Sequence, residues 1–203
     1  MGKQSAVFLE TEGAAWLRRN LTKLADPAND PVIATMKASG IIPRIILEVG
    51  CANGWRLRQF QKTWPCIVAG IDPGVLNVDP LWMDRGTADN LSMHLTGRFD
   101  TVVYGFCLYL CDREDLFKIV AEGDRVLKDG GHLIVYDFHA DTPFARHYAH
   151  YAGVHSYKMD YAKLWLSNPA YSVVRRERHG LDDDKTCVTI MKKNLTAAWP
   201  IHD

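Results

Sequence analysis

The sequence predicts a doubly wound α/β fold, built on a mostly parallel sheet of seven strands that ends in an antiparallel C-terminal hairpin. Short runs of Val, Ile and Leu recur between residues 45 and 138, and amphipathic helical patterns separate them. Strands that are apolar along their whole length are typical of a parallel sheet covered by helices on both faces. Near the C-terminus, two strand patterns follow each other with no room for a crossover helix.

Two helical patterns open the chain. In the first, residues 14–24, leucines recur at helical intervals. The second has Asp30 as its N-cap, Pro31 in its first turn and Gly40 as its stop signal. We expect both patterns to belong to a helical cap on the rest of the domain.

Strand and helix patterns then alternate. Strands are expected at 45–49, 66–72, 82–86, 99–106 and 132–138. One helix is expected near 54–63, and a second over 112–131, where two glycines follow a single apolar stripe. The hairpin of strands 171–179 and 186–193 completes the sheet, and the three aspartates of its loop are expected to form a solvated turn.

Composition argues against several classes of partner. Lys plus Arg and Asp plus Glu number 24 each, so there is no bulk positive charge, and we expect no nucleic-acid partner. No apolar run approaches membrane-spanning length, so no membrane association is expected. The five cysteines show neither a CxxC pair nor a zinc spacing, and no export signal precedes them. They predict reduced thiols in a cytoplasmic protein without a metal site.

The stretch RIILEVGCANGW, residues 44–55, is the most informative part of the chain. Glu48 interrupts an apolar strand near its end, and two glycines bound the loop that follows. Ligands of open α/β sheets bind outside the carboxyl ends of the strands, where the strand order reverses. A dinucleotide-binding loop would carry glycines where this chain has Ala52 and Trp55, so a nicotinamide cofactor is the weaker interpretation.

The pattern ExGxxxG, followed by an acid at the end of the next strand, resembles class I S-adenosylmethionine-dependent methyltransferases over residues 45–137. The resemblance implies a Rossmann-like methyltransferase fold, with S-adenosyl-L-methionine as donor and S-adenosyl-L-homocysteine as product. In that family an acid at the position of Glu48 reads the methionine end of the cofactor. An acid at Asp72 accepts both ribose hydroxyls, and Asp89 of GTADNL matches an acid that accepts the adenine amino group. Ala52 departs from the commonest form of the glycine loop.

The resemblance therefore implies a cofactor site along four strand ends. Its expected members are Glu48, Gly50, Cys51, Ala52, Asn53 and Gly54, then Asp72 and Pro73, then Ala88, Asp89 and Asn90, and finally Gly105 and Phe106. The N-terminal helix is expected to cap this site. Its Arg19 either meets the cofactor carboxylate or lies on the exposed face of an amphipathic helix.

The whole chain, residues 1–203, is interpreted as a single methyltransferase domain. Its expected parts are a helical cap (1–40), a cofactor-binding half (41–138), an acceptor segment with the C-terminal hairpin (139–193) and a tail (194–203). Segments 7–20 and 153–174 also resemble small methyltransferases encoded among bacterial surface-polysaccharide and sugar-modification enzymes.

Residues 136–161 follow the fifth strand, where this fold commonly places an acceptor-binding insertion, and they are rich in His and Tyr. His139 is the first candidate for a general base, because it lies just past the strand end and histidine titrates near neutrality. Tyr148, Tyr157 and Lys158 are candidates for binding an anionic acceptor. Methyl transfer needs a base only for a hydroxyl or an ammonium acceptor, so catalysis by positioning alone stays open.

The tetrapeptide NPAY (168–171) resembles the box of amino-methylating enzymes that act on adenine or glutamine. It precedes the hairpin instead of following the fourth strand, so we expect a turn there. The sequence thus predicts methyl transfer to a small polar acceptor such as a sugar or sugar nucleotide. A non-catalytic methyltransferase-like partner subunit remains an alternative, and so does a nicotinamide-dependent oxidoreductase.

Overall fold

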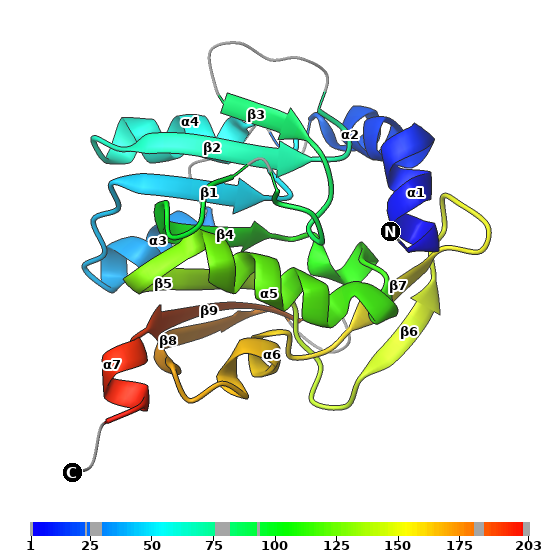
Figure 1. Cartoon of the computed structure of the whole chain (residues 1–203). Coiled ribbons are helices and arrows are strands. Elements are labelled where there is room, and N and C mark those ends of the chain that lie inside the picture. Colours follow the sequence, from blue (N-terminus) through cyan, green and yellow to red (C-terminus); the bar gives the residue numbers. More distant parts are fainter. Residues whose placement is uncertain are drawn as a thin grey trace.

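The computed structural model describes residues 2–22, 24, 30–75, 82–92, 94–180 and 185–200, and it shows a seven-stranded sheet between two layers of helices (Figure 1). From one edge to the other the strands are β3 (Trp82–Arg85), β2 (Ile67–Asp72), β1 (Ile45–Val49), β4 (Phe99–Gly105), β5 (Leu127–Phe138), β9 (Thr186–Lys193) and β8 (Tyr171–His179). Strand β9 runs antiparallel to both of its neighbours, whereas the other pairs are parallel. The predicted fold is confirmed; the aspartates of the hairpin loop lie outside the described residues.

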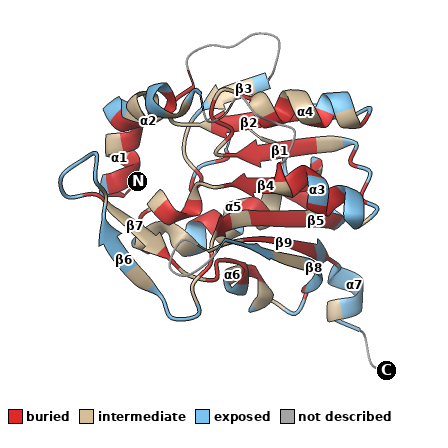
Figure 2. Ribbon diagram, turned by 180° about the vertical axis from the view of Figure 1, so that it is seen from behind, coloured by how far each residue is buried: buried red, intermediate tan, exposed pale blue. Residues whose placement is uncertain are grey.

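Helices cover the two faces of the sheet separately. On one face, α3 (Pro31–Ala38) and α4 (Trp55–Thr63) contribute side chains such as Met36 and Phe60 to a core against β1 and β4. On the other face, α5 (Leu116–Val126) and α6 (Ala162–Leu166) pack Ile119 and Trp165 against Tyr104 of β4. The central strands are accordingly the most thoroughly buried elements (Figure 2). The predicted N-cap is present, since the Asp30 side chain accepts a hydrogen bond of 2.9 Å from the backbone N–H of Ile33.

The C-terminal boundary predicted for the helix over 112–131 is wrong. The helix expected over 112–131 ends at Val126, after a 3₁₀ turn over Arg113–Asp115, and β5 begins at once. The reason is burial: Leu127 is 1% exposed and pairs with Phe99 of β4. The glycine that signalled a helix stop, Gly130, instead adopts a positive φ of 74° within the irregular first part of the strand.

Several short elements had no clear sequence signal. They are a 3₁₀ turn (Leu108–Leu110), a two-stranded sheet of β6 (Phe144–His147) and β7 (His155–Lys158), and α7 (Leu195–Ala198). The β6–β7 sheet projects from the carboxyl edge of the main sheet (Figure 1). None of the helices in the described part of the chain is long and apolar enough to cross a membrane.

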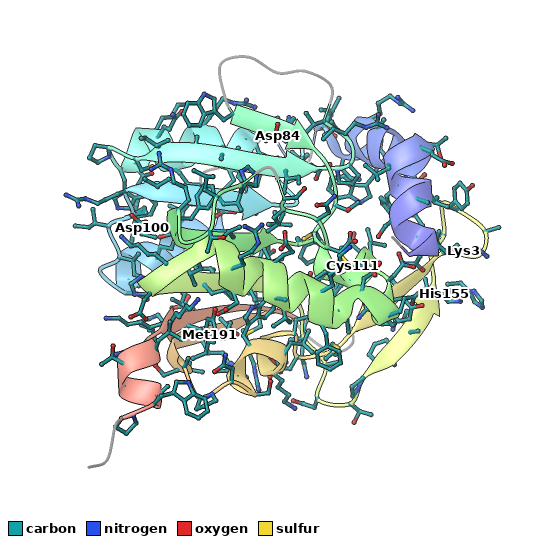
Figure 3. The ribbon with its side chains drawn as sticks, in the orientation of Figure 1. Lys3, Asp84, Asp100, Cys111, His155 and Met191 are labelled. Carbon is teal, nitrogen blue, oxygen red and sulfur yellow. The ribbon has the colours of Figure 1, made fainter. Side chains whose placement is uncertain are left out.

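The N-terminal segment lies across the carboxyl ends of the strands (Figure 1). It consists of α1 (Lys3–Val7), a π-helical turn (Phe8–Glu12) and α2 (Gly13–Asn20), so helix begins earlier than predicted. The Asp112 carboxylate accepts hydrogen bonds from the backbone N–H groups of Gln4 and Ser5. The Gln4 side chain bonds the backbone of His155, where α1 meets β7 (Figure 3).

A contact between two glycines holds α2 against the loop after β2. A Cβ atom added to Gly13 would lie 2.8 Å from the backbone nitrogen of Gly74 and 2.9 Å from the carbonyl carbon of Pro73. Such a separation is too short for a real side chain, and neither partner is a flexible group. The position of the N-terminal segment therefore depends on the lack of a side chain at residue 13.

We predict that Gly13→Ala lowers the midpoint of thermal unfolding, although Ala is favoured over Gly inside a helix by about 1 kcal/mol. The added methyl group would push α2 away from the loop at Gly74. Thr11→Ala is the matched control, because Thr11 is exposed in the preceding turn and its replacement should change stability by no more than about 0.5 kcal/mol. A Gly13→Ala protein that melts above the wild type would contradict this role.

Candidate functional site

A cavity of about 490 Å³ opens at the carboxyl ends of β1, β2, β4 and β5. Its floor includes the ends of these strands, and its other side is formed by the N-terminal segment through Phe8, Gly13, Trp16 and Asn20. The volume is typical of a small-molecule site. The cavity lies where chain order in the sheet reverses, between β1 and β4. This is the place at which open α/β sheets bind ligands.

The loop after β1 brings its backbone to the cavity in left-handed conformations, which are strained at Ala52 but not at glycine. Gly50 has a φ of 81°, and Ala52, which carries a side chain, has a φ of 51°. The N–H groups of Gly50 and Cys51 both donate to the carbonyl oxygen of Ile71, which fixes the loop against β2. Gly54 also has a positive φ, 72°, and forms the N-cap of α4. Strained backbone of this kind is concentrated at functional sites, where the surrounding structure enforces it.

Asp72, at the end of β2, faces the cavity from beside this loop. Its Oδ2 accepts a hydrogen bond of 3.0 Å from the N–H of Ala52, and its Oδ1 accepts one of 2.7 Å from the N–H of Gly74. Burial raises the pKa of this carboxyl group, while the two backbone donors act in the opposite direction. The side chain thus joins the loops after β1 and β2, and each oxygen retains acceptor capacity.

Asp89 lies in the cavity wall beyond β3 with one oxygen unused. Its Oδ2 is 2.9 Å from Nζ of Lys118, whereas the buried Oδ1 has no partner among the described residues. Burial disfavours the charged form, but hydrogen bonds from Thr87 and Lys118 outweigh it and lower the pKa of Asp89. An ionised, buried oxygen without a partner is costly. It is therefore a strong acceptor for a ligand N–H group.

A buried ion-pair cluster forms another part of the wall. The Nε atom of Arg56 lies 3.0 Å from Oδ2 of Asp30, and its Nη1 donates to Oε1 of Glu48. Burial raises the pKa of Glu48 to about 7, against the opposing effect of Arg56. The rings of Trp55 and Tyr136 flank the guanidinium group, with centroids 4.6 Å and 5.8 Å from its central carbon.

The loop after β4 closes the cavity opposite the glycine loop. Phe106 has a φ of 64°, which again is unusual for a residue with a side chain. The carboxylate of Asp137 holds the following turn, because its Oδ2 accepts from the N–H groups of Leu108 (2.8 Å) and Tyr109 (3.3 Å). Burial raises the pKa of Asp137 to about 7 despite these donors.

The structure brings eight of the fourteen residues expected to hold the cofactor to the cavity wall: Gly50, Ala52, Asp72, Pro73, Ala88, Asp89, Gly105 and Phe106. The other six do not line it: Arg19, Glu48, Cys51, Asn53, Gly54 and Asn90. Glu48 instead pairs with Arg56, and Arg19 with Glu12 and Tyr148. Asn53 and Asn90 accept local backbone hydrogen bonds, and Cys51 packs beneath the loop against Gly70.

The residues expected to serve the acceptor lie outside the cavity. His139 is buried beside a separate hollow of about 10 Å³, with its Nε2 3.5 Å from Oδ1 of Asp141. Lys158 is buried with its Nζ 3.9 Å from the ring centroid of Phe138. Tyr157 stacks under the guanidinium group of Arg113, at 4.2 Å.

The main residues that sequence reasoning missed are Trp55, Arg56 and Tyr136. A signal for Arg56 was present, because it falls on the buried side of α4 with Leu57 and Phe60. A basic residue on the buried side of a helix implies an acid or a ligand as its partner. Tyr136 was predicted only as part of the fifth strand and of the acceptor segment 136–161, because no local pattern shows that its ring reaches the cavity.

Residues 47–135 match the sequence profile of a family described as "Methyltransferase domain". These residues carry a methyltransferase domain. The matched segment runs from β1 almost to the end of β5, and so includes the glycine loop, Asp72 and Asp89. No curated protein matches the chain by sequence.

Solved structures of methyltransferases share the fold of this methyltransferase domain. The 1,6-didemethyltoxoflavin-N1-methyltransferase of Burkholderia thailandensis, solved with 1,6-didemethyltoxoflavin and S-adenosylhomocysteine, has a TM-score of 0.73 at 19% identity, over 93% of this chain and 88% of that one. The N-methyltransferase NodS of Bradyrhizobium japonicum WM9, solved with S-adenosyl-l-homocysteine, gives 0.60 at 17% identity, over 89% and 98%. A SAM-dependent methyltransferase of Methanosarcina mazei gives 0.61 at 17% identity, over 82% and 99%. At such identities the similarity establishes the fold alone.

We predict that Gly50→Val abolishes binding of S-adenosylhomocysteine, measured by titration calorimetry, while the protein stays folded. A Cβ atom at Gly50 would lie 2.6 Å from Cβ of Cys107 and would close the approach between the loops after β1 and β4. Gly97→Val is the matched control, because Gly97 also has a positive φ, 61°, but no atom within 4 Å of an added Cβ. Normal affinity in the Gly50→Val protein would show that the ligand does not approach this loop.

Proposed function

We propose that this methyltransferase moves the methyl group of S-adenosylmethionine to a small polar acceptor, such as a sugar or sugar nucleotide. The observation that carries the proposal is the convergence of Gly50, Asp72 and Asp89 on one cavity, where Asp89 Oδ1 has no hydrogen-bond partner among the described residues. These groups suit the donor, in which a sulfonium joins an adenosine to an amino acid. The two related structures above hold S-adenosylhomocysteine in their own sites.

The adenosine of the donor would lie over the β2–β3 side of the cavity. The ribose hydroxyls would donate to Asp72, since a carboxylate accepts from two O–H groups with charge-assisted bonds. The adenine amino group would donate to Oδ1 of Asp89, whose other oxygen is already bonded by Lys118. Gly50 and Gly105 would leave space for the chain that carries the sulfonium.

Aromatic side chains surround the remaining part of the cavity and would receive the acceptor. Trp16 comes from the N-terminal segment and Phe106 from the loop after β4, while Trp55 of α4 and Tyr136 of β5 line the wall beside Arg56. Rings of this kind bury the flat face of a sugar or heterocycle and exclude water. The fold is similar to that of 1,6-didemethyltoxoflavin-N1-methyltransferase. This similarity is compatible with a sugar and with a heterocycle as the acceptor.

We infer that catalysis depends on positioning and not on a base from residues 136–161. Transfer from a sulfonium is an in-line displacement, so holding acceptor, methyl group and sulfur in line supplies much of the rate enhancement. His139 lies in a different hollow from the cavity, and burial lowers its pKa. The proposal therefore assigns Tyr148 to support of the N-terminal wall, where its hydroxyl donates to Oε1 of Glu12.

For the donor site, we predict that Asp89→Ala weakens S-adenosylhomocysteine binding by about 1.5–3 kcal/mol, the usual worth of a hydrogen bond to a charged group. The same variant should bind S-inosylhomocysteine, which has no adenine amino group, with nearly wild-type affinity. Lys118→Ala is the matched control, since it removes the ion pair of Asp89 but keeps Oδ1. If Asp89→Ala lost the same affinity for both ligands, Asp89 would not bind the adenine amino group.

For the acceptor site, we predict labelled-methyl transfer to members of a panel of sugars and sugar nucleotides, and none to tRNA or peptides. His139→Ala should leave the rate within a few-fold, whereas loss of a true general base would cost about 10²- to 10⁴-fold. Gly50→Val serves as the inactive control. Transfer to tRNA or peptides alone would overturn the small-molecule proposal, and a hundredfold loss in His139→Ala would restore the base predicted from the sequence.

A further inference from the structure

We propose that Arg56, and not Glu48, meets the amino-acid end of the methyl donor, and that its guanidinium group binds the donor carboxylate. This inference rests on the proposed function, and it assigns a new role to the acid of the ExGxxxG motif. Glu48 and Asp30 are positioning residues that hold Arg56 in place.

The guanidinium group of Arg56 has one edge committed and one edge free for a ligand. Its Nε is bonded to Asp30 and its Nη1 to Glu48. Its Nη2 makes no hydrogen bond to any described residue, and the side chain is 6% exposed although it lines the cavity. Arg56 is the one basic side chain among the described residues of the cavity wall, where Asp30, Asp72 and Asp89 supply negative charge.

Arg56 is placed at the end of the cavity opposite the adenine side. A Cβ atom on Gly105, the last residue of β4, would lie 2.7 Å from Nη1 of Arg56. Tyr136 of β5 flanks the same guanidinium group. Asp72 and Asp89, by contrast, lie at the ends of β2 and beyond β3. A donor with its adenosine on the β2–β3 side would therefore extend its amino-acid end towards β4 and Arg56.

Glu48 is poorly placed to read that end directly. It is fully buried, does not line the cavity, and its Oε1 is already bonded by Arg56. Its Oε2 is also buried and has no hydrogen-bond partner among the described residues. A planar guanidinium, held by two acids, offers directed N–H donors that match a carboxylate.

The test compares three ligands by titration calorimetry on the full chain. S-adenosylhomocysteine carries both the carboxylate and the ammonium. Its decarboxylated analogue keeps only the ammonium, and its deaminated analogue keeps only the carboxylate. The first variant is Arg56→Lys, which keeps the charge but has one nitrogen in place of the three of the guanidinium group. The second is the double variant Glu48→Gln with Arg56→Gln, which removes both charges of the ion pair together. Thermal melting establishes that each variant is folded.

We expect both variants to lose about 10- to 100-fold in affinity for the two ligands that carry a carboxylate. Binding of the decarboxylated analogue should change less than threefold. Glu48→Gln alone should preserve the preference for carboxylate-bearing ligands, because a Gln oxygen can still accept from Arg56. If Glu48 bound the donor ammonium itself, Glu48→Gln would not be expected to keep this preference.

Three results would overturn the inference. One is equal losses for all three ligands in Arg56→Lys. Another is a selective loss of ammonium-bearing ligands in Glu48→Gln, which would return the role to Glu48. The third is unchanged donor affinity in Arg56→Lys with a raised acceptor KM, which would make Arg56 a receptor for an acceptor anion. If wild-type protein binds no S-adenosylhomocysteine at all, the proposed function itself fails, which is a distinct outcome.

Discussion

The site depends on one topological constraint, the reversal of strand order between β1 and β4. The chain moves from β1 to β2 and β3 on one side, and then returns to β4 and β5 on the other. Loops that leave adjacent strand ends in opposite directions open a crevice between them. Gly50 lies at this point, so close to Cys107 that no side chain fits. The crevice therefore depends both on the strand order and on the lack of a side chain at Gly50.

The buried cluster of Asp30, Arg56 and Glu48 is an expensive feature to build beside such a crevice. Charges removed from water are costly, and replacing a buried ion pair by apolar residues often stabilises a protein. Stability alone therefore does not account for the cluster. It does join three elements: the N-cap of α3, the end of β1 and the first turn of α4. A charge that must face a ligand at a fixed place explains this arrangement better than packing does.

Sequence reasoning was accurate where local patterns determine structure. The strands, the N-cap at Asp30 and the C-terminal hairpin follow from apolar periodicity and from residues with strong positional preferences. It failed where long-range packing decides. The early end of α5 follows from the pairing of Leu127 with Phe99, which no local signal shows.

The site divides in the same way. Gly50, Asp72 and Asp89 were predicted because a spaced motif carries them, and all three line the cavity. Arg56 was missed, and Tyr136 was not singled out within the segment 136–161, because their roles depend on which strands and helices become neighbours. His139 follows β5 directly in the chain, yet it lies by a different hollow. A position just after a strand end in the sequence therefore did not establish that the side chain lines the cavity.

The measurement that tests this account most directly is a crystal structure of the full chain with S-adenosylhomocysteine bound. The account predicts adenine density within hydrogen-bond reach of Oδ1 of Asp89, ribose hydroxyls on Asp72, and the carboxylate on Nη2 of Arg56. Density that places the amino-acid end away from Arg56 would contradict the proposed direction of the donor in the cavity. Density outside the cavity would contradict the site as a whole.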